Sequence, residues 1–185
     1  NMLFLTANGE VTENLNPDTD RVWTGKDLTP EIQGSFGFNL DFKGFFLTTQ
    51  FNYAIGQDRY DFDLSGFQDP TSIGQFRHTR DLLRAWTPTN RFTDIPALDA
   101  SNIDLDGTRY LKNADFLRLR FVSLGYNLPK SLLDKAGIRT SRVFFSAENL
   151  VTFSQWRGFD AETFSNTSRL YPTPRSFTFG IEVGI

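Results

Sequence analysis

The chain has no cysteine and a single histidine among its 185 residues. Without cysteine, a disulfide scaffold, thiolate zinc sites and a thiol nucleophile are excluded. A Ser-His-Asp arrangement would have to use His78, whose neighbours Arg77 and Arg80 indicate an exposed loop instead. The acidic residues near the start do not follow the spacing of an EF-hand. We therefore expect no catalytic residue, no metal site and no cofactor.

Long apolar runs and an excess of one charge are also missing. No stretch of about 18 apolar residues exists, which excludes a membrane-spanning helix. The first residues lack the basic start and the cleavage site of a signal peptide, so an exported protein would carry its signal upstream. Basic and acidic residues nearly balance, 19 against 22, which gives no reason to expect nucleic acid as a partner.

Phenylalanine is abundant instead, with 20 copies, and much of it follows a period of two. Residues 32–42, 45–55 and 176–185 alternate apolar side chains with small or polar ones, which predicts strands with one apolar face. The apolar positions are Ile32, Gly34, Phe36, Phe38, Leu40 and Phe42, then Phe45, Leu47, Thr49, Phe51, Tyr53 and Ile55, then Phe177, Phe179, Ile181, Val183 and Ile185. None of them is charged, and we expect this set to face lipid.

Each of these strands has about the length that a membrane barrel needs. About 11 residues at ~3.3 Å each, tilted by about 45°, span roughly 25 Å, the height of the apolar band. Lys43-Gly44 predicts a two-residue hairpin turn between the first two strands, with glycine at a positive φ.

Further strands are predicted at residues 116–126 and 142–153, and residues 2–7 are interpreted as the end of an earlier strand. The alternation in the first of these shifts phase near Phe121, which predicts a β-bulge. Between them, Pro129 and Gly137 bracket one or two helical turns.

The connections alternate between short and long. Two residues join the first pair of strands, about 59 residues (57–115) follow, then a short helical link, then about 20 residues (155–174). Tight turns at one end and long loops at the other are typical of outer-membrane barrels. A lipocalin-like barrel or a β-sandwich remains the alternative, although no amphipathic helix here is long enough to cover an open apolar sheet.

Several motifs then point to one family. Residues 115–130 resemble a pattern of FLRL followed by LGY and LP, and residues 137–153 resemble a strand that ends in NL-TF. Residues 158–160 and 171–180 resemble GYDPE and YPxPRTFTFG, and residues 84–90 resemble RWTPEN. In this order the motifs are similar to those of TonB-linked outer-membrane transporters of the SusC/RagA type, over nearly the whole chain. The chain departs from them at Ala85, Thr89 and Phe159.

That resemblance implies an all-β fold, an antiparallel transmembrane β-barrel of about 22 strands. Residues 1–185 would be its C-terminal segment and supply about the last five or six strands, with the plug domain and the N-terminal strands outside this chain. The family imports oligosaccharides or peptides through the outer membrane of Gram-negative bacteria, with long loops outside the cell. Its partners are a SusD-like surface lipoprotein that serves as a lid and the TonB complex that supplies energy.

Two other functions stay open at this stage. The first is an outer-membrane barrel enzyme such as a lipase or protease, which the single histidine disfavours. The second is a barrel without transport activity, used as an adhesin or as the anchor of a secretion machine.

Aromatic and basic residues of the long connections are the candidates for contact with a substrate or with the lid. They are Trp86, Arg91 and Phe92 in the first long connection and Trp156 and Arg157 in the last. Exposed aromatic rings stack on sugars or pack against a partner protein. The alternatives are that they fold each loop onto itself or mark the membrane interface.

The end of the chain resembles the C-terminal insertion signal of outer-membrane barrels, a polar residue followed by glycine and two spaced hydrophobic residues. Thr178, Gly180, Val183 and Ile185 match that spacing, although the terminal residue is not aromatic. The alternative is that they are simply lipid-facing strand residues.

Overall fold

The computed structural model describes residues 1–103, 107–163 and 171–185. These residues form two compact units. In the described part of the chain, the first unit holds residues 1–28, 58–103 and 107–112, and the second holds residues 29–57, 113–163 and 171–185.

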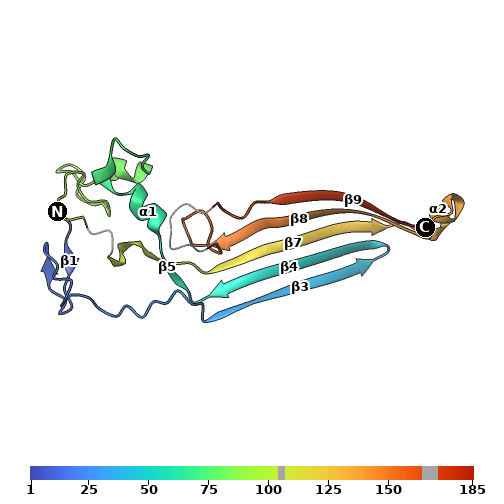
Figure 1. The fold of residues 1–185 in the computed structure, drawn as a ribbon, viewed down its shortest axis with the longest axis horizontal. Helices are drawn as coiled ribbons and strands as arrows, with labels where there is room; N and C mark the ends of the chain where they lie inside the picture. The colour runs from blue at the N-terminus through green and yellow to red at the C-terminus, as the bar shows by residue number, and fades with distance from the viewer. Residues whose placement is uncertain (104–106, 164–170) are drawn as a thin grey trace. The chain divides into compact units, whose positions relative to one another are not determined.

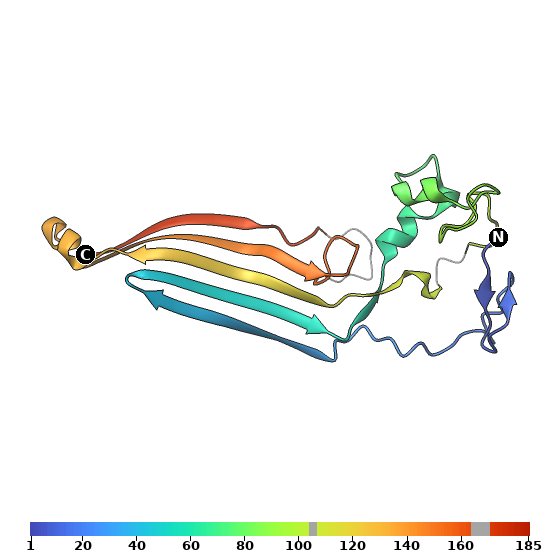
Figure 2. The same cartoon turned by 180° about the vertical axis from the view of Figure 1, so that it is seen from behind.

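The second unit is a five-stranded antiparallel sheet in the order β3-β4-β7-β8-β9 (Figure 1). The strands are β3 (Ile32–Phe42), β4 (Phe45–Ile55), β7 (Phe116–Asn127), β8 (Thr140–Ser154) and β9 (Ser176–Gly184). Every strand predicted for this sheet is therefore present. The same neighbours lie side by side when the sheet is seen from behind (Figure 2).

Tight turns join the strands at one end of the sheet. Phe42 pairs with Phe45, so the β3–β4 link has two residues, and both Lys43 (φ 49°) and Gly44 (φ 90°) are left-handed, as a type I′ turn requires. Between β7 and β8 the chain forms α2 (Lys130–Leu133) and η4 (Asp134–Ala136). The expected helical turns and the expected hairpin are both confirmed, and the C-terminus lies at this same end (Figure 1).

The predicted β-bulge is present in β7. Leu119 pairs with Phe51 and Phe121 pairs with Gln50, which leaves Arg120 without a partner in β4. The extra residue reverses the parity of the strand, so Leu119 and Val122 occupy one face although they are three residues apart.

The register joins the apolar positions into one continuous face, because cross-strand partners point to the same side of a sheet. One row across all five strands is Leu40–Leu47–Leu124–Phe145–Phe179. The neighbouring row on the opposite face is Asn39–Thr48–Ser123–Ser146–Thr178, all small or polar and uncharged. On the apolar face, Phe36 stacks on Phe51 with ring centroids 5.0 Å apart. We call the other side the polar face.

The first unit contains only short elements. They are β1 (Phe4–Leu5), β2 (Val11–Thr12), β5 (Asp58–Tyr60), α1 (Phe62–Phe67), η1 (Pro70–Ser72), η2 (Arg80–Arg84), η3 (Thr108–Tyr110) and β6 (Leu111–Asn113), whose last residue belongs to the second unit. Side-chain caps begin three of the helices, since Asp61, Asp69 and Thr79 each accept a hydrogen bond from a backbone N–H of the first turn. The strand expected at residues 2–7 is two residues long and pairs with β2 in a small hairpin, not with the five-stranded sheet.

Within the described ranges, no helix has both the length and the apolar character needed to cross a membrane.

Candidate functional site

The polar face carries its densest set of charged contacts at the end of the sheet opposite the tight turns. Arg118 of β7 stands between Asn52 of β4 and Thr152 of β8 in the ladder. Its side chain is among the most buried charged groups described, with the residue 3% exposed. Burial of a guanidinium is tolerated only when the charge is paired and hydrogen-bonded.

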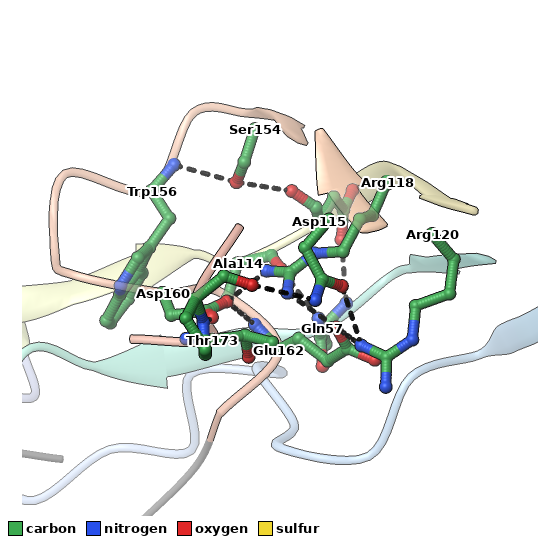
Figure 3. A network of polar contacts seen from close by, with 12 residues as sticks. Gln57, Ala114, Asp115, Arg118, Arg120, Ser154, Trp156, Asp160, Glu162 and Thr173 are labelled. Carbon is green, nitrogen blue, oxygen red and sulfur yellow. Dashed lines mark hydrogen bonds and ion pairs between the residues drawn. The ribbon is translucent and has the colours of Figure 1, made fainter. Parts of the chain in front are cut away.

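Arg118 is paired twice, with two carboxylates from the last long connection (Figure 3). Its Nη2 donates to Oδ1 of Asp160, and its Nη1 lies 2.9 Å from Oε2 of Glu162. The planar fork of arginine allows the two nitrogens to reach two separate acceptors. We call Arg118, Asp160 and Glu162 the arginine clamp.

Asp160 also joins the two ends of the last long connection through hydrogen bonds. Its carboxylate accepts hydrogen bonds from the backbone N–H of Glu162 (2.9 Å) and of Thr173 (3.0 Å). Burial raises the pKa of the Asp160 carboxyl, but the two N–H groups and the Arg118 guanidinium outweigh it, so the pKa lies below its ordinary value. Asp160 is thus held as a carboxylate.

The β-bulge adds a second arginine to the polar face beside the clamp. Arg120 lies 3.5 Å from Glu162 and donates from Nη1 to Oδ1 of Asn149 (3.0 Å). Asn149 adopts a positive φ of 52° and donates its own Nδ2 to the carbonyl of Pro174 (3.0 Å). The bulge therefore serves to aim Arg120 at the last connection, which links that connection to β7 and β8.

Hydrogen bonds also fix the residues at which the first long connection leaves and re-enters the sheet. Gln57 is fully buried, and its Nε2 donates to the carbonyl of Ala114 (2.6 Å). The backbone N–H of Gln57 donates to Oδ1 of Asp115 (3.0 Å), and Ser154 donates its hydroxyl to the carbonyl of Asp115 (2.7 Å). Asp115 therefore joins β4, β7 and β8 at one place (Figure 3).

An apolar contact lies next to these polar groups. Ala54, Phe116 and Ala161 form a small buried cluster, and Trp156 packs against it. Ala161 is next to Asp160 in the chain, so the clamp and this contact hold the same segment, residues 156–162. The half-buried Trp156 is thereby fixed, whereas Phe159 is 59% exposed.

The candidates of the first long connection lie in the first unit. Leu82, Ala85 and Ile95 form their own buried cluster, and the N–H of Trp86 donates to the carbonyl of Ile95 (2.9 Å). Around this cluster Trp86 remains 43% exposed and Phe92 is fully exposed. Arg91 is exposed too, with its Nε donating to the carbonyl of Pro88 (3.1 Å).

The candidates for an insertion signal lie along or just after β9. Thr178, Gly180 and the exposed Val183 belong to the strand, and Ile185 follows it. Thr178 and Gly180 point to the polar face, and Val183 points to the apolar face. Gly180 pairs with Phe144, whose ring lies where a β-carbon at position 180 would be.

A different polar cluster occupies the end of the polar face near the tight turns. Arg142 pairs with Glu182, with distances of 2.6 and 2.7 Å between their side chains. The guanidinium also lies 5.7 Å from the ring centroid of Phe46 and 5.9 Å from that of Phe144. Both charged side chains are largely exposed, unlike those of the arginine clamp.

Sequence reasoning missed the arginine clamp, although it noted the two motifs that contain it. The pattern that could have shown it is the pair of arginines at positions 118 and 120 of a predicted membrane strand, together with two acidic residues in the last long connection. His78 lies in a loop between the exposed Arg77 and Arg80, as expected, and is itself half-buried, with Nδ1 3.3 Å from the carbonyl of Phe67. Among the described residues, no group of three or more His, Asp or Glu is arranged to hold a metal ion.

No protein-family model matches the chain. Among curated proteins, it is 32% identical over 97% of its length to TonB-dependent receptor P3 of Formosa agariphila. It is 28% identical over 92% of its length to TonB-dependent receptor P39 of the same organism. The chain spans 18% and 17%, respectively, of the lengths of these relatives.

The chain is also similar to part of a solved peptide importer. The RagAB peptide importer in its open-open state matches 99% of this chain with a TM-score of 0.86 and 31% identity. In the closed-closed state it matches 97% with a TM-score of 0.82 and 32% identity. Each match covers 20% of that longer chain. The expected fold, a set of antiparallel strands from a larger barrel, is confirmed by this likeness, and none of these relatives is named as an enzyme.

Proposed function

Because the chain is homologous over nearly its whole length to TonB-dependent receptors of the SusC/RagA type, we propose that it is a segment of an active importer in the outer membrane of a Gram-negative bacterium. In this proposal residues 1–185 supply the last strands of the barrel. The plug domain and the other strands belong to parts of the protein outside this chain. The relatives, which are several times longer, support this division.

The observation that carries the proposal is the segregation of the two faces of the sheet. An uncharged apolar face that is continuous over five strands suits lipid, and a polar face suits a water-filled or plugged lumen. The tight turns then lie on the periplasmic side and the long connections lie outside the cell.

The cargo in this proposal is an oligosaccharide or a peptide. Trp156 and Arg157 belong to the last long connection, which returns to the polar face, and stacking on aromatic rings suits both kinds of cargo. Of the two classes of cargo, we favour peptides, because the solved structure that the chain resembles is named a peptide importer.

The partner in this proposal is a SusD-like surface lipoprotein that covers the channel. Trp86, Arg91 and Phe92 form the contact surface that we assign to it. Their loop already has a buried cluster of its own in Leu82, Ala85 and Ile95, so it does not need the exposed Phe92 to fold. Aromatic residues and arginine are enriched in the centres of protein interfaces.

The test is energy-dependent uptake by cells that produce the intact protein as their only receptor of this kind. Labelled peptides of mixed sequence and labelled oligosaccharides are supplied separately, and accumulation is measured with and without TonB. We expect one of the two mixtures to accumulate only when TonB is present. Surface binding that is unaffected by TonB, with no accumulation of either mixture, would contradict the importer and favour an adhesin.

A further inference from the structure

We propose that Arg118 is a positioning residue that holds residues 156–162 against the polar face of the sheet and so makes this segment part of the wall that cargo passes. The inference rests on the proposed function in one respect, namely that the polar face lines the channel. Arg118 itself does not touch the cargo in this proposal. It acts through Asp160 and Glu162 on Trp156 and Phe159, the aromatic residues that precede them in the segment.

The charges explain why the segment stays in place. Both carboxylates that neutralise Arg118 come from the segment, and the cation comes from β7. If the segment moved away, the buried guanidinium would lose both partners at once. Asp160 would lose a charge-assisted hydrogen bond, and Glu162 would lose its ion pair with Arg118. A lysine at position 118 would present a single ammonium instead of a fork and would match only one carboxylate well.

The return end of the last connection is anchored by Asp160 of the clamp and by Arg120 and Asn149 beside it. Asp160 receives the N–H of Thr173, and Asn149 receives Arg120 while donating to Pro174. The connection is therefore attached to the polar face where it begins and where it returns. With the segment in place, Trp156 is fixed on Ala54 and Phe116, and the exposed ring of Phe159 is available to a passing molecule.

The clamp is separable from the sheet itself. Arg118 takes part in the ladder with Asn52 and Thr152 through its backbone, which a change of side chain preserves. Arg118 and Asp160 are 42 positions apart in the chain, and Arg118 lies near the first residue of β7. Replacing Arg118 by glutamine should therefore release the segment while β7 stays paired.

The experiment uses the intact receptor in whole cells, with Ala161→Cys as the only accessible cysteine, because Ala161 is buried while the segment lies on the face. The rate of labelling by a bulky membrane-impermeant maleimide reports how often the segment leaves the face. Uptake of labelled cargo reports the half-saturation concentration and the maximal rate per receptor. Arg118→Gln is compared with Arg118→Lys and with the matched control Arg142→Gln, which breaks an exposed ion pair on the same face.

We expect Arg118→Gln to raise the labelling rate by about tenfold, since a buried ion pair is lost, and Arg142→Gln to leave it unchanged. In receptors that retain alanine at position 161, Arg118→Gln should raise the half-saturation concentration for cargo more than it lowers the maximal rate. Arg118→Lys should fall between the wild type and Arg118→Gln in both measurements.

An unchanged labelling rate in Arg118→Gln would overturn the proposal, and so would faster labelling with an unchanged half-saturation concentration. If Arg118→Gln does not assemble, Glu162→Gln and Asp160→Asn replace it with the same two readouts and the same criteria. Absence of uptake in the wild type would instead contradict the importer. The labelling rates would still show whether the clamp holds the segment.

Discussion

At position 180 the sheet has no room for a side chain. A β-carbon on Gly180 would lie 2.3 Å from Cζ and 2.6 Å from Cε1 of Phe144, its partner in β8. The ring of Phe144 thus takes the space that the glycine leaves open on the polar face. Gly180 therefore has a packing role that does not depend on an insertion signal.

We predict that Gly180→Ala lowers the amount of folded receptor in the outer membrane, because overpacking of this kind costs about 1–3 kcal/mol. Adding Phe144→Ala should restore assembly, since it removes the ring that the new methyl group meets. The measurement is the heat-modifiable fraction of the receptor in outer-membrane extracts, with Phe144→Ala alone as the control. If the double variant assembles no better than Gly180→Ala, the glycine itself is what the insertion machinery recognises.

Protonation of Asp160 at low pH should weaken the arginine clamp, whereas a rise in pH above neutrality should not affect this contact. Its pKa in the folded protein is lowered from an ordinary value of 3.8, so the carboxylate contributes stability that is fully present above that value. That contribution is lost as the pH falls through the lowered pKa and the carboxyl becomes protonated.

We predict that a spin label on Phe159→Cys remains immobilised from neutral pH down to about pH 4 and becomes mobile only below it. Electron paramagnetic resonance of the purified receptor provides the measurement. A label on Ser146→Cys, in the uncharged row of β8, is the control for general unfolding and should not change over the same range. Release of the segment near neutral pH would contradict the role given to Asp160.

Each strand of the sheet presents an apolar face on one side and a polar face on the other. On β3, Phe38 belongs to the apolar set and the next residue, Asn39, begins the polar row that crosses all five strands. Because the two positions are adjacent in the strand, they lie at nearly the same depth and differ mainly in the face that they occupy.

We predict that Phe38→Arg prevents assembly and that Asn39→Arg is tolerated. An arginine facing lipid near the middle of the bilayer costs about 2–4 kcal/mol, whereas one in the lumen does not. The amount of receptor in the outer membrane, compared with the amount degraded in the periplasm, gives the measurement. Equal losses for both variants would mean that the apolar face does not meet lipid.

For the whole molecule, the exposed loop of the first unit is the feature that suggests assembly with another protein. The hydrogen bond from Trp86 to Ile95 brings the ends of residues 87–94 together, so a short glycine linker can replace them. Phe92 would be removed with this segment, while the buried cluster of Leu82, Ala85 and Ile95 would be kept.

We predict that this replacement, and to a lesser degree Phe92→Ser, reduces recovery of the surface lipoprotein when the intact receptor is purified through a tag. Truncation of a central aromatic contact commonly costs about 2 kcal/mol or more of binding free energy. Trp23→Ser is the matched control, because Trp23 is another highly exposed aromatic residue, outside that loop. Unchanged recovery would leave Phe92 as a residue of the loop surface only.

Local features of the fold followed from the sequence because they depend on neighbours in the chain. Alternation of apolar and polar residues identified the strands, Lys43-Gly44 identified the hairpin, and Pro129 and Gly137 bracketed the helical turns. The phase shift near Phe121 even located the bulge to within one residue of Arg120. All of these signals lie within a few residues of the structure that they specify.

The functional contacts were decided by tertiary structure, because they join residues that are far apart in the sequence. Nothing local distinguishes Arg118 and Asp160 from other charged residues, and only the return of the last connection to β7 brings them together. The same holds for Phe144 over Gly180, which depends on the register of β8 and β9. A period of two specifies which face each side chain occupies, but the partner across the sheet follows only when the strands are paired.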